Sequence, residues 1–429
     1  MSKKKVLFIH QNFPAQFKSI APFLAFTKKY EVYTLAWKKT LKEDDYLKSM
    51  GDMTHYQYEI EIGSSKNIHP LATEFESKMI RADSVALKCF ELKNKGFTPD
   101  LIIDHPGWGE TLFIKEVWPD VKILSFFEYY YNTSDSDVDF DLEQSTVNGY
   151  EMSKKLIARN APINLSYSIC DGIFAPTNFQ KSTAPKWLQN KINVIHDGID
   201  TDLIKPGLNN ASISIKYKNI NDNKLISTKL SKKDKIITFV NRNFEPYRGY
   251  HSFVRTLPLI QKSHPDAFIL LIGGDQVSYG APHQSGESYK NIFLKEVNDT
   301  LVDPSKLIFL GKVDYKTFIS ILDLSSVHVY LTYPFVLSWS MLEVMALEKV
   351  VVGSKTGPVE EVIQDNINGL LVDFFDTKDI ANKVISVLDN PKKFDAIRKK
   401  ARKTIIDNYD LRRVSLPKQM ALIESILDE

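Results

Sequence analysis

The sequence predicts an α/β protein made of two α/β domains in tandem. Short apolar, β-branched runs alternate with longer helix-like runs, which is typical of parallel sheets covered by helices. The alternation begins with a strand at residues 5–9, a helix at 17–26 and a second strand at 30–36. It restarts halfway along, with a strand at 236–240 and a helix at 250–262. A chain of 429 residues is long enough for two or three domains, each with its own core.

The remaining elements follow in order along each half. Further helices are predicted at 71–95, at 151–158, at 340–347 and from Val359 onward. Further strands are predicted at 101–103, 121–127, 169–175, 192–195, 267–272, 308–310, 327–331 and 350–352. Residues 196–206 carry Asp-Gly and Pro turn chemistry, which indicates a junction between domains. Residues 207–234 are rich in Asn, Lys and Ser, so we expect a flexible surface insertion there.

Composition excludes several classes of protein. Hydrophobic residues make up 43% and charged residues 25%, which are ordinary globular values, and a net charge of +2 argues against a dedicated nucleic-acid surface. The basic start followed by the apolar run 6–9 is too short for a signal peptide, and no stretch has the length of a membrane span. Cys89 and Cys170 lack metal-ligand spacing and are expected to be buried thiols in a reducing compartment. We therefore expect a soluble cytoplasmic protein, which leaves room for peripheral contact with the inner membrane.

The segment 128–141 is aromatic and then acidic. Asp135, Asp137 and Asp139 form two overlapping Asp-x-Asp pairs, a pattern that can hold a metal ion. Such pairs are common in Asp-rich loops, so we expect a solvated acidic loop and no metal site.

A polar side chain follows the strand at 101–103. His105 lies in a Gly- and Pro-rich turn at the carboxyl end of that strand. Ligands of open α/β sheets bind outside the carboxyl ends of the strands, so His105 is a candidate functional residue. The alternative is a structural histidine in a tight turn.

Two arginines follow the strand at 236–240. Arg242 and Arg248 flank the loop, and Gly249 precedes the next helix. Guanidinium groups beside a helix N-terminus can clamp a diphosphate and stabilise the charge that develops as it leaves. The alternative is two ordinary surface arginines. Gly274, at the end of the strand 267–272, would allow close approach of a ligand.

The stretch 332–369 contains one acid inside an apolar helix start. Glu343 lies among Leu342, Val344 and Met345, and a carboxylate there is costly unless it accepts hydrogen bonds. The two adjacent hydroxyls of a nucleotide ribose would suit it. The alternative is an ordinary exposed Glu on an amphipathic helix.

Four segments carry a resemblance to a known family. They are VLFIHQNFPAQF at the start, PDLIIDH, VIHDGIDTDLIKP and LEVMALEKVVVGSKTGPVEEVIQDNINGLLVDFFD. Over nearly its whole length the chain resembles the retaining glycosyltransferases of family four. The resemblance implies the GT-B fold, in which two Rossmann-like domains have parallel sheets that face each other across a cleft. It implies an N-terminal acceptor-binding domain at 1–196, a nucleotide-sugar-binding domain at 197–409, and a C-terminal helix at 410–429 that packs back on the first domain.

The resemblance also implies residue roles. Glu343 matches the second Glu of the family's Glu-x7-Glu motif and is expected to bind the ribose. The first Glu, which touches the donor sugar, is replaced here by Phe335. Arg242 matches the phosphate-binding Arg, and Arg248 stands where the family has Lys, after a loop one residue longer. His105 matches the histidine near the reacting sugar.

The other implied contacts lie in two loops and at one glycine. Backbone amides of Ser338, Trp339 and Ser340 are expected to approach the sugar and β-phosphate, beside Gly274. The first loop matches the acceptor-side loop but lacks its glycine pair. The residues assigned to that loop are Asn12, Phe13, Ala15 and Gln16.

Two functional hypotheses follow. The first is a retaining, metal-independent transferase without a cofactor that moves a sugar from a UDP- or GDP-type donor to a glycan, lipid-linked or other acceptor, in cell-surface polysaccharide or glycoconjugate synthesis. The second is a non-catalytic GT-B protein that binds a nucleotide or glycan, and Phe335 favours it. A dehydrogenase would need a Gly-x-Gly-x-x-Gly after the first strand, and that motif is absent.

Overall fold

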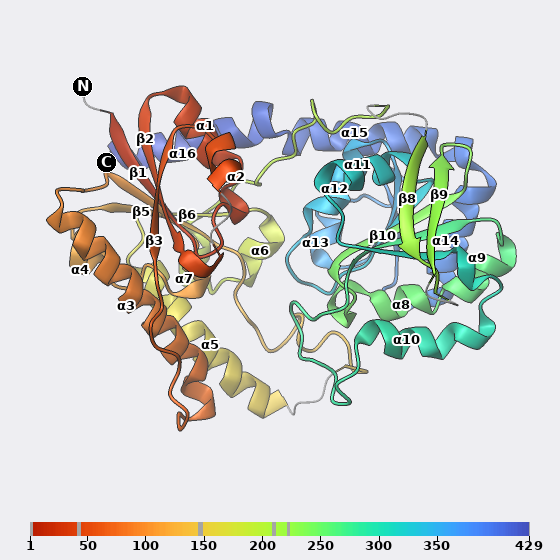
Figure 1. Ribbon diagram of the computed structural model, residues 1–429, viewed down its shortest axis with the longest axis horizontal. Coiled ribbons are helices and arrows are strands. Elements are labelled where there is room, and N and C mark those ends of the chain that lie inside the picture. The colour runs from red at the N-terminus through yellow and green to blue at the C-terminus, as the bar shows by residue number, and fades with distance from the viewer. Residues whose placement is uncertain (1–2, 41–43, 145–148, 208–211, 221–223, 429) are drawn as a thin grey trace. The chain divides into compact units, whose positions relative to one another are not determined.

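The computed structural model describes residues 3–40, 44–144, 149–207, 212–220 and 224–428 (Figure 1). The chain divides into two compact units. Unit 1 contains Met1–Val138, Ser145–Gly198 and Arg412–Glu429, and unit 2 contains Asp139–Gln144 and Ile199–Leu411. Each unit holds its own parallel sheet, so the predicted pair of Rossmann-like domains is confirmed.

Unit 1 is built on a parallel sheet with strand order β3-β2-β1-β4-β5-β6-β7. The strands are β1 (Lys4–Ile9), β2 (Tyr30–Trp37), β3 (Met53–Tyr58), β4 (Leu101–Asp104), β5 (Lys122–Phe126), β6 (Gly172–Ala175) and β7 (Ile192–Val194). The helices are α1 (Ile20–Thr27), α2 (Asp44–Ser49), α3 (Thr73–Asn94), α4 (Ile114–Val117), α5 (Gly149–Ser168), α6 (Asn178–Thr183), α7 (Lys186–Gln189) and α16 (Leu416–Asp428). The central strands β1 and β4 are apolar without alternation because helices cover both faces of the sheet.

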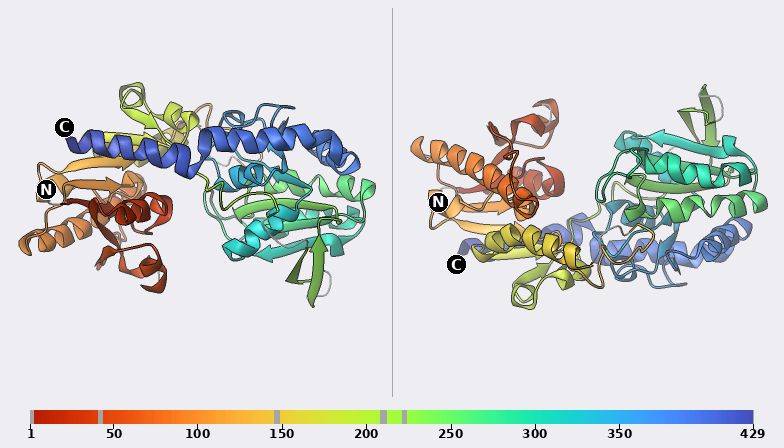
Figure 2. Two further views of the ribbon diagram at one scale, coloured as in Figure 1. Left: turned by 90° about the horizontal axis from the view of Figure 1, so that it is seen from above. Right: turned by 90° about the horizontal axis from the view of Figure 1, so that it is seen from below.

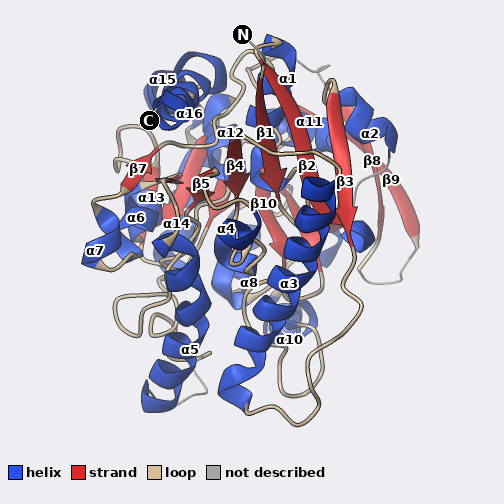
Figure 3. Ribbon diagram, turned by 90° about the vertical axis from the view of Figure 1, so that its left-hand side faces the viewer, coloured by secondary structure: helices blue, strands red, loops and turns tan. Residues whose placement is uncertain are grey.

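Two long helices and the end of the chain complete unit 1. The helices α3 and α5 pack side by side (Figure 3). The last helix, α16, packs on β5, and an ideal Cβ at Gly172 would lie 2.4 Å from Cδ1 of Ile426. The Ile426 side chain of α16 thus packs directly over Gly172 of β6.

Unit 2 is built on a second parallel sheet, with strand order β12-β11-β10-β13-β14-β15. Its strands are β10 (Ile236–Asn243), β11 (Phe268–Gly274), β12 (Leu307–Gly311), β13 (Val327–Tyr330), β14 (Val350–Ser354) and β15 (Leu370–Val372). Its helices are α8 (Tyr250–Val254), α9 (Leu257–Ser263), α10 (Tyr289–Val297), α11 (Tyr315–Leu324), α12 (Trp339–Ala346), α13 (Gly357–Glu360), α14 (Thr377–Asp389) and α15 (Asp395–Tyr409).

An antiparallel hairpin replaces the expected flexible insertion. The described residues of 207–234 form β8 (Ser212–Lys218) and β9 (Leu225–Ser231), which project from unit 2 (Figure 2). Ile215, Tyr217 and Leu230 are buried and join the core under β11 and β12. The low content of large apolar residues wrongly predicted a segment without regular structure. A hairpin with one face in solvent needs apolar side chains only on its inner face.

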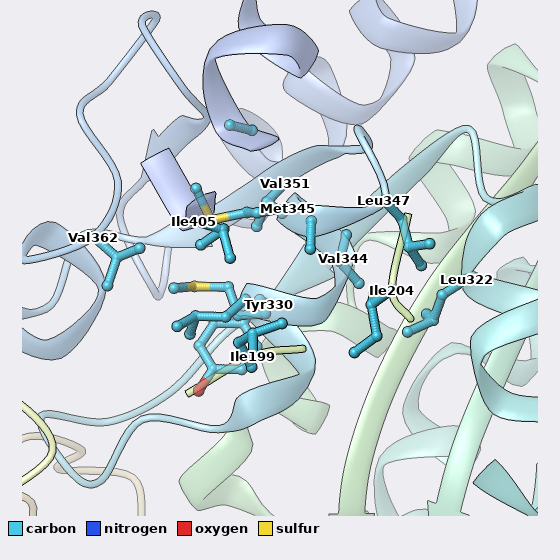
Figure 4. Packing of buried hydrophobic residues seen from close by; sticks show 14 of the residues in the cluster. Ile199, Ile204, Leu322, Tyr330, Val344, Met345, Leu347, Val351, Val362 and Ile405 are labelled. Atoms are coloured by element: carbon cyan, nitrogen blue, oxygen red, sulfur yellow. The ribbon is translucent and has the colours of Figure 1, made fainter. Parts of the chain in front are cut away.

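The helix α12 packs into a buried apolar cluster of unit 2 (Figure 4). Every residue from Ser340 to Ala346 is buried. The Arg402 guanidinium also donates to the backbone carbonyls of Ala346, Ile204 and Thr201. A helix held in this way gives its side chains fixed positions, which a binding site requires.

Three element predictions need correction. Glu343 lies in the second turn of α12, because the helix begins one residue earlier than predicted. The helix predicted from Val359 is a single turn, α13. The acidic loop is not uniformly solvated, since Asp137 and Asp141 are both buried. No helix in the described ranges is long and apolar enough to cross a membrane.

Candidate active site

Arg248 is buried beyond the carboxyl end of β10, a central strand of the unit 2 sheet. It ends a short 3-10 turn, Pro246–Arg248, and Gly249 follows with φ of 67°. An ideal Cβ on Gly249 would lie 2.3 Å from Cβ of Leu331, so only glycine allows this tight turn. The turn directs Arg248 inward, where Nη1 donates to Thr332 Oγ1 at 2.8 Å and to the carbonyl of Val336 at 2.9 Å.

Aromatic rings surround the Arg248 guanidinium. Its Cζ lies 5.0 Å from the ring centre of Tyr279 and 5.9 Å from that of Phe335. The two rings meet edge to face, with centroids 5.1 Å apart, and Tyr247 lies 5.6 Å from Phe335. Phe335, at the position where a carboxylate was expected, therefore forms an aromatic wall with Tyr247 and Tyr279 beside the buried Arg248 cation.

Arg242 differs from Arg248 in its surroundings. Arg242 is the last residue but one of β10 and is exposed. Its side chain makes no hydrogen bond or ion pair within the described residues. Gly274 ends the neighbouring strand, where an ideal Cβ would lie 2.4 Å from Oδ1 of Asn243. A glycine at this position therefore permits the close approach of the Asn243 side chain.

Glu343 is a buried carboxylate that already has one partner. It is 4% exposed, and its Oε1 accepts a hydrogen bond of 2.7 Å from the Tyr315 hydroxyl. The structure thus excludes the alternative of an exposed Glu on an amphipathic helix.

Backbone amides at the start of α12 already donate hydrogen bonds to groups of the protein. The Ser338 amide donates to the Tyr330 hydroxyl at 2.8 Å, and the Ser340 amide donates to Ser338 Oγ at 3.4 Å. Ser338 therefore caps α12. Of the three amides expected to approach a sugar and phosphate, those of Ser338 and Ser340 are engaged within the protein.

The segment Asp139–Gln144 lies between β5 and β6 of unit 1 in sequence but belongs to unit 2. The Asp141 carboxylate lies 3.0 Å from His251 Nε2 and accepts a hydrogen bond from the Tyr333 hydroxyl. Burial opposes its charge, but the hydrogen bonds from His251 and Tyr333 outweigh this and lower the pKa of Asp141. The centroid of the Tyr333 ring lies 4.8 Å from that of Tyr247, and the two rings are tilted. Asp141 therefore supports the aromatic wall through its hydrogen bond from Tyr333.

In unit 1, His105 follows β4 and is buried. Its Nε2 lies 3.3 Å from Oε2 of Glu128. Burial disfavours the charged imidazolium, yet the Glu128 carboxylate outweighs it and raises the pKa of His105. His105, Glu128 and Trp108 line a small cavity of about 100 Å³. This cavity distinguishes His105 from a purely structural histidine in a turn.

Unit 1 also contains titratable residues that sequence reasoning missed. The His10 ring lies 5.3 Å from that of His105, and burial together with the charge of His105 holds the pKa of His10 well below its usual value. Burial also raises the pKa of Asp104 to about 6 and that of Glu110 to about 7. His10 follows β1 directly, so the strand-end rule that selected His105 would have found it.

The predicted acceptor-side loop is only partly accessible. Phe13 is fully buried and packs against Phe8, with ring centroids 6.2 Å apart. Phe13 therefore supports the loop and is wrong as a ligand contact. Asn12, Ala15 and Gln16 are half-buried.

No group of three or more His, Cys, Asp or Glu side chains in the described ranges could hold a metal ion. Asp137 instead accepts a hydrogen bond from the Tyr129 hydroxyl at 3.1 Å. The thiols of Cys89 and Cys170 form no disulfide, and burial raises both of their pKa values.

Comparison with known families agrees with this geometry. Residues 31–204 match the model of the glycosyl transferase family 4 group, and residues 221–404 match that of the glycosyl transferases group 1. The chain belongs to the group 1 glycosyltransferases with the GT-B fold.

Curated relatives match over part of their length. An uncharacterized glycosyltransferase of Methanocaldococcus jannaschii is 25% identical over 199 residues, which are 46% of this chain and 47% of that protein. Spore coat protein SA of Bacillus subtilis is 25% identical over 184 residues, 42% of this chain and 46% of that protein. The chain thus spans about half the length of the curated relatives it matches.

Solved structures match along the whole chain. A glycosyltransferase from Rickettsia africae has a TM-score of 0.66 at 16% identity, with 100% of both chains covered. Sucrose-phosphate synthase from Thermosynechococcus elongatus has a TM-score of 0.70 at 14% identity, again with 100% of both chains covered. HepE of Anabaena in complex with UDP-glucose has a TM-score of 0.66 at 14% identity, covering 98% of this chain and 99% of that one. At these identities the likeness shows the fold.

Proposed function

We propose that the protein transfers a sugar from a nucleoside-diphosphate donor to an acceptor, with retention of anomeric configuration and without a metal ion. The observation that carries this proposal is the arrangement of Arg248, Arg242 and Glu343 around the strand ends of unit 2. Arg248 is buried, Arg242 is exposed beside it in sequence, and Glu343 is a buried carboxylate on a rigid helix.

In this proposal Glu343 orients the nucleotide and the arginines drive departure of the diphosphate. Glu343 accepts hydrogen bonds from the ribose hydroxyls. Arg242 and Arg248 neutralise the charge that grows on the diphosphate as the glycosidic bond breaks, which is the work that a bound metal does in other transferases. The acceptor hydroxyl then forms the new C–O bond on the face that the diphosphate has left, and its proton passes to the departing diphosphate.

The donor and acceptor classes follow from the family. We propose a UDP- or GDP-type donor, and HepE, whose structure contains UDP-glucose, supports UDP-glucose as a first probe. We propose that unit 1 binds the acceptor, a glycan or lipid-linked molecule, with His105 as its functional histidine. The product would enter cell-surface polysaccharide or glycoconjugate synthesis on the cytoplasmic side, with peripheral contact at the inner membrane.

Donor hydrolysis tests the proposal without knowledge of the acceptor. The protein is incubated with a panel of UDP- and GDP-sugars in EDTA, and the released nucleotide is measured. We expect one donor to be consumed, with the released sugar appearing first in the anomeric form of the donor. Activity that is lost in EDTA and restored by manganese or magnesium would refute metal independence, and the opposite anomer would refute retention.

The second candidate is a protein that binds a nucleotide sugar without turnover. It is favoured by Phe335, which stands at the donor-sugar position as an aromatic ring that cannot accept a hydrogen bond as a carboxylate does. UDP binding without consumption of any donor would support it.

A further inference from the structure

A second buried carboxylate lies beside Arg248. Glu245 is 0% exposed, and its two carboxylate oxygens accept hydrogen bonds from three successive backbone amides. The donors are the amides of Ser278 and Tyr279 at 3.1 Å and of Gly280 at 3.3 Å. Hydrogen bonds from several amides to one carboxylate are strong, because the acceptor is charged. Glu245 therefore fixes residues 278–280.

These residues belong to the loop between β11 and α10. Asn243 Nδ2 also donates to Ser278 Oγ at 2.6 Å, so two side chains from the end of β10 and its loop hold the same turn. The loop lies far from Glu245 in sequence but is tied to the turn that carries Arg248. By fixing the backbone of this turn, Glu245 also positions the side chain of Tyr279.

The Tyr279 ring stands against the Arg248 guanidinium and the Phe335 ring, at the distances given above. Nη1 of Arg248 donates to Thr332 and Val336, and a further side-chain hydrogen bond joins Arg248 to Tyr279. A guanidinium has five N–H groups, three of them on Nε and Nη2, so it has donors beyond these for a phosphate. A phosphate binds along the edge of the fork, not on its face. A group attached to that phosphate would then lie next to the rings of Tyr279 and Phe335.

We infer that Tyr279 is a specificity-determining residue for the donor sugar and that Glu245 is its positioning residue. This inference rests on the proposed function, because it assumes that the diphosphate binds Arg248. The aromatic wall replaces the carboxylate at residue 335, and it selects sugars by contact with an apolar ring face. Glu245 acts through the turn at 278–280.

Titration calorimetry with UDP and UDP-glucose as probes tests the role of Tyr279. We expect Tyr279→Ala to weaken UDP-glucose binding roughly fivefold to tenfold, the effect of one lost aromatic contact, and UDP binding by less than about twofold. Tyr279→Phe, which keeps the ring, should stay within about twofold of wild type for both ligands. Tyr150→Ala removes a tyrosine of unit 1 that is 70% exposed and serves as the matched control, which should bind both ligands as wild type does.

Amide exchange tests the role of Glu245 without any ligand. In Glu245→Gln the shape is kept but the charge is lost, so the amides at 278–280 should exchange faster with deuterium than in wild type. The same variant should lose UDP-glucose affinity selectively, as Tyr279→Ala does. A fold defect would instead weaken both ligands equally.

The outcomes separate this inference from the proposed function. A wild-type protein that binds neither UDP nor UDP-glucose contradicts the donor assignment itself. If wild type binds both, the inference alone is overturned by equal losses for the two ligands in Tyr279→Ala, by tighter UDP-glucose binding in that variant, or by unchanged exchange at 278–280 in Glu245→Gln.

Discussion

Replacing Glu343 with Gln gives a sharp test of nucleotide binding. The side chain is 4% exposed and lies on a helix whose neighbouring residues are all buried, so a glutamine of the same shape should keep the fold. The amide oxygen can still accept the hydrogen bond from the Tyr315 hydroxyl. What changes is the charge of the acceptor that a ribose would meet.

The expected loss follows from the number of ribose bonds. A hydrogen bond to a charged group is worth about 1.5–3 kcal/mol and one between neutral groups about 0.5–1.5 kcal/mol, so each ribose bond should lose about 1–1.5 kcal/mol. If Tyr315 keeps its hydrogen bond to Oε1 and the ribose donates a single bond to the carboxylate, UDP should bind roughly fivefold to tenfold more weakly. If the ribose displaces Tyr315 and takes both oxygens, the loss should approach about a hundredfold.

Tyr315→Phe is the matched control for Glu343→Gln. It keeps the charge but removes the hydrogen bond of 2.7 Å from the Tyr315 hydroxyl to the buried carboxylate, which should lower the free energy of unfolding by about 1–3 kcal/mol. UDP affinity should be equal to wild type or higher, because the ligand restores the missing bond. Calorimetry with UDP and urea denaturation measure the two quantities. UDP binding that is unchanged in Glu343→Gln would refute the ribose assignment.

Three further predictions address the wall, the turn and the buried acid of unit 1. Phe335→Glu should not raise turnover of the native donor, and a large rise in the donor assay would show that Phe335 is a defect. Gly249→Ala should destabilise unit 2 by about 2–5 kcal/mol in urea denaturation, from left-handed backbone and the clash with Leu331, and a stable variant would contradict the turn geometry. Burial raises the pKa of Glu110 from 4.5 to about 7, so the folded state binds more protons than the unfolded state in that window, and the free energy of unfolding should fall as pH rises through it. Relative to Glu110→Gln, wild type should lose about 3 kcal/mol between pH 4 and pH 8, and parallel pH profiles would refute the shifted pKa.

The strands, and the positions of the main candidate residues at or near the strand ends, could be predicted from sequence. Apolar runs in parallel sheets are continuous, and the strand-end rule needs only their order along the chain. The rule placed Arg242 and Arg248 at the end of one strand and His105 at the end of another. It failed at Phe13, because a residue in a strand-end loop can point into the core as easily as toward a ligand.

The supporting residues could not be predicted. Glu245 accepts hydrogen bonds from amides more than thirty positions away. Because every residue except proline has a backbone amide, no side chain in the sequence marks Glu245 as a residue with a partner. Asp141 looked like part of a solvated acidic loop, yet it is buried in unit 2 between His251 and Tyr333. Both acids are explained only by tertiary contacts.

Binding of UDP in EDTA to wild type and to Arg242→Ala tests the central claim most directly. Arg242 is exposed and its side chain makes no hydrogen bond or ion pair within the described residues, so its truncation should not disturb the fold. Lys262→Ala, which removes an exposed charge near the end of α9, is the control. We predict that wild type and Lys262→Ala bind UDP without metal and that Arg242→Ala binds roughly tenfold to a hundredfold more weakly, the loss of one charge-assisted phosphate contact. Equal affinity in Arg242→Ala and wild type, or wild-type binding only when a divalent ion is added, would contradict an arginine-held diphosphate.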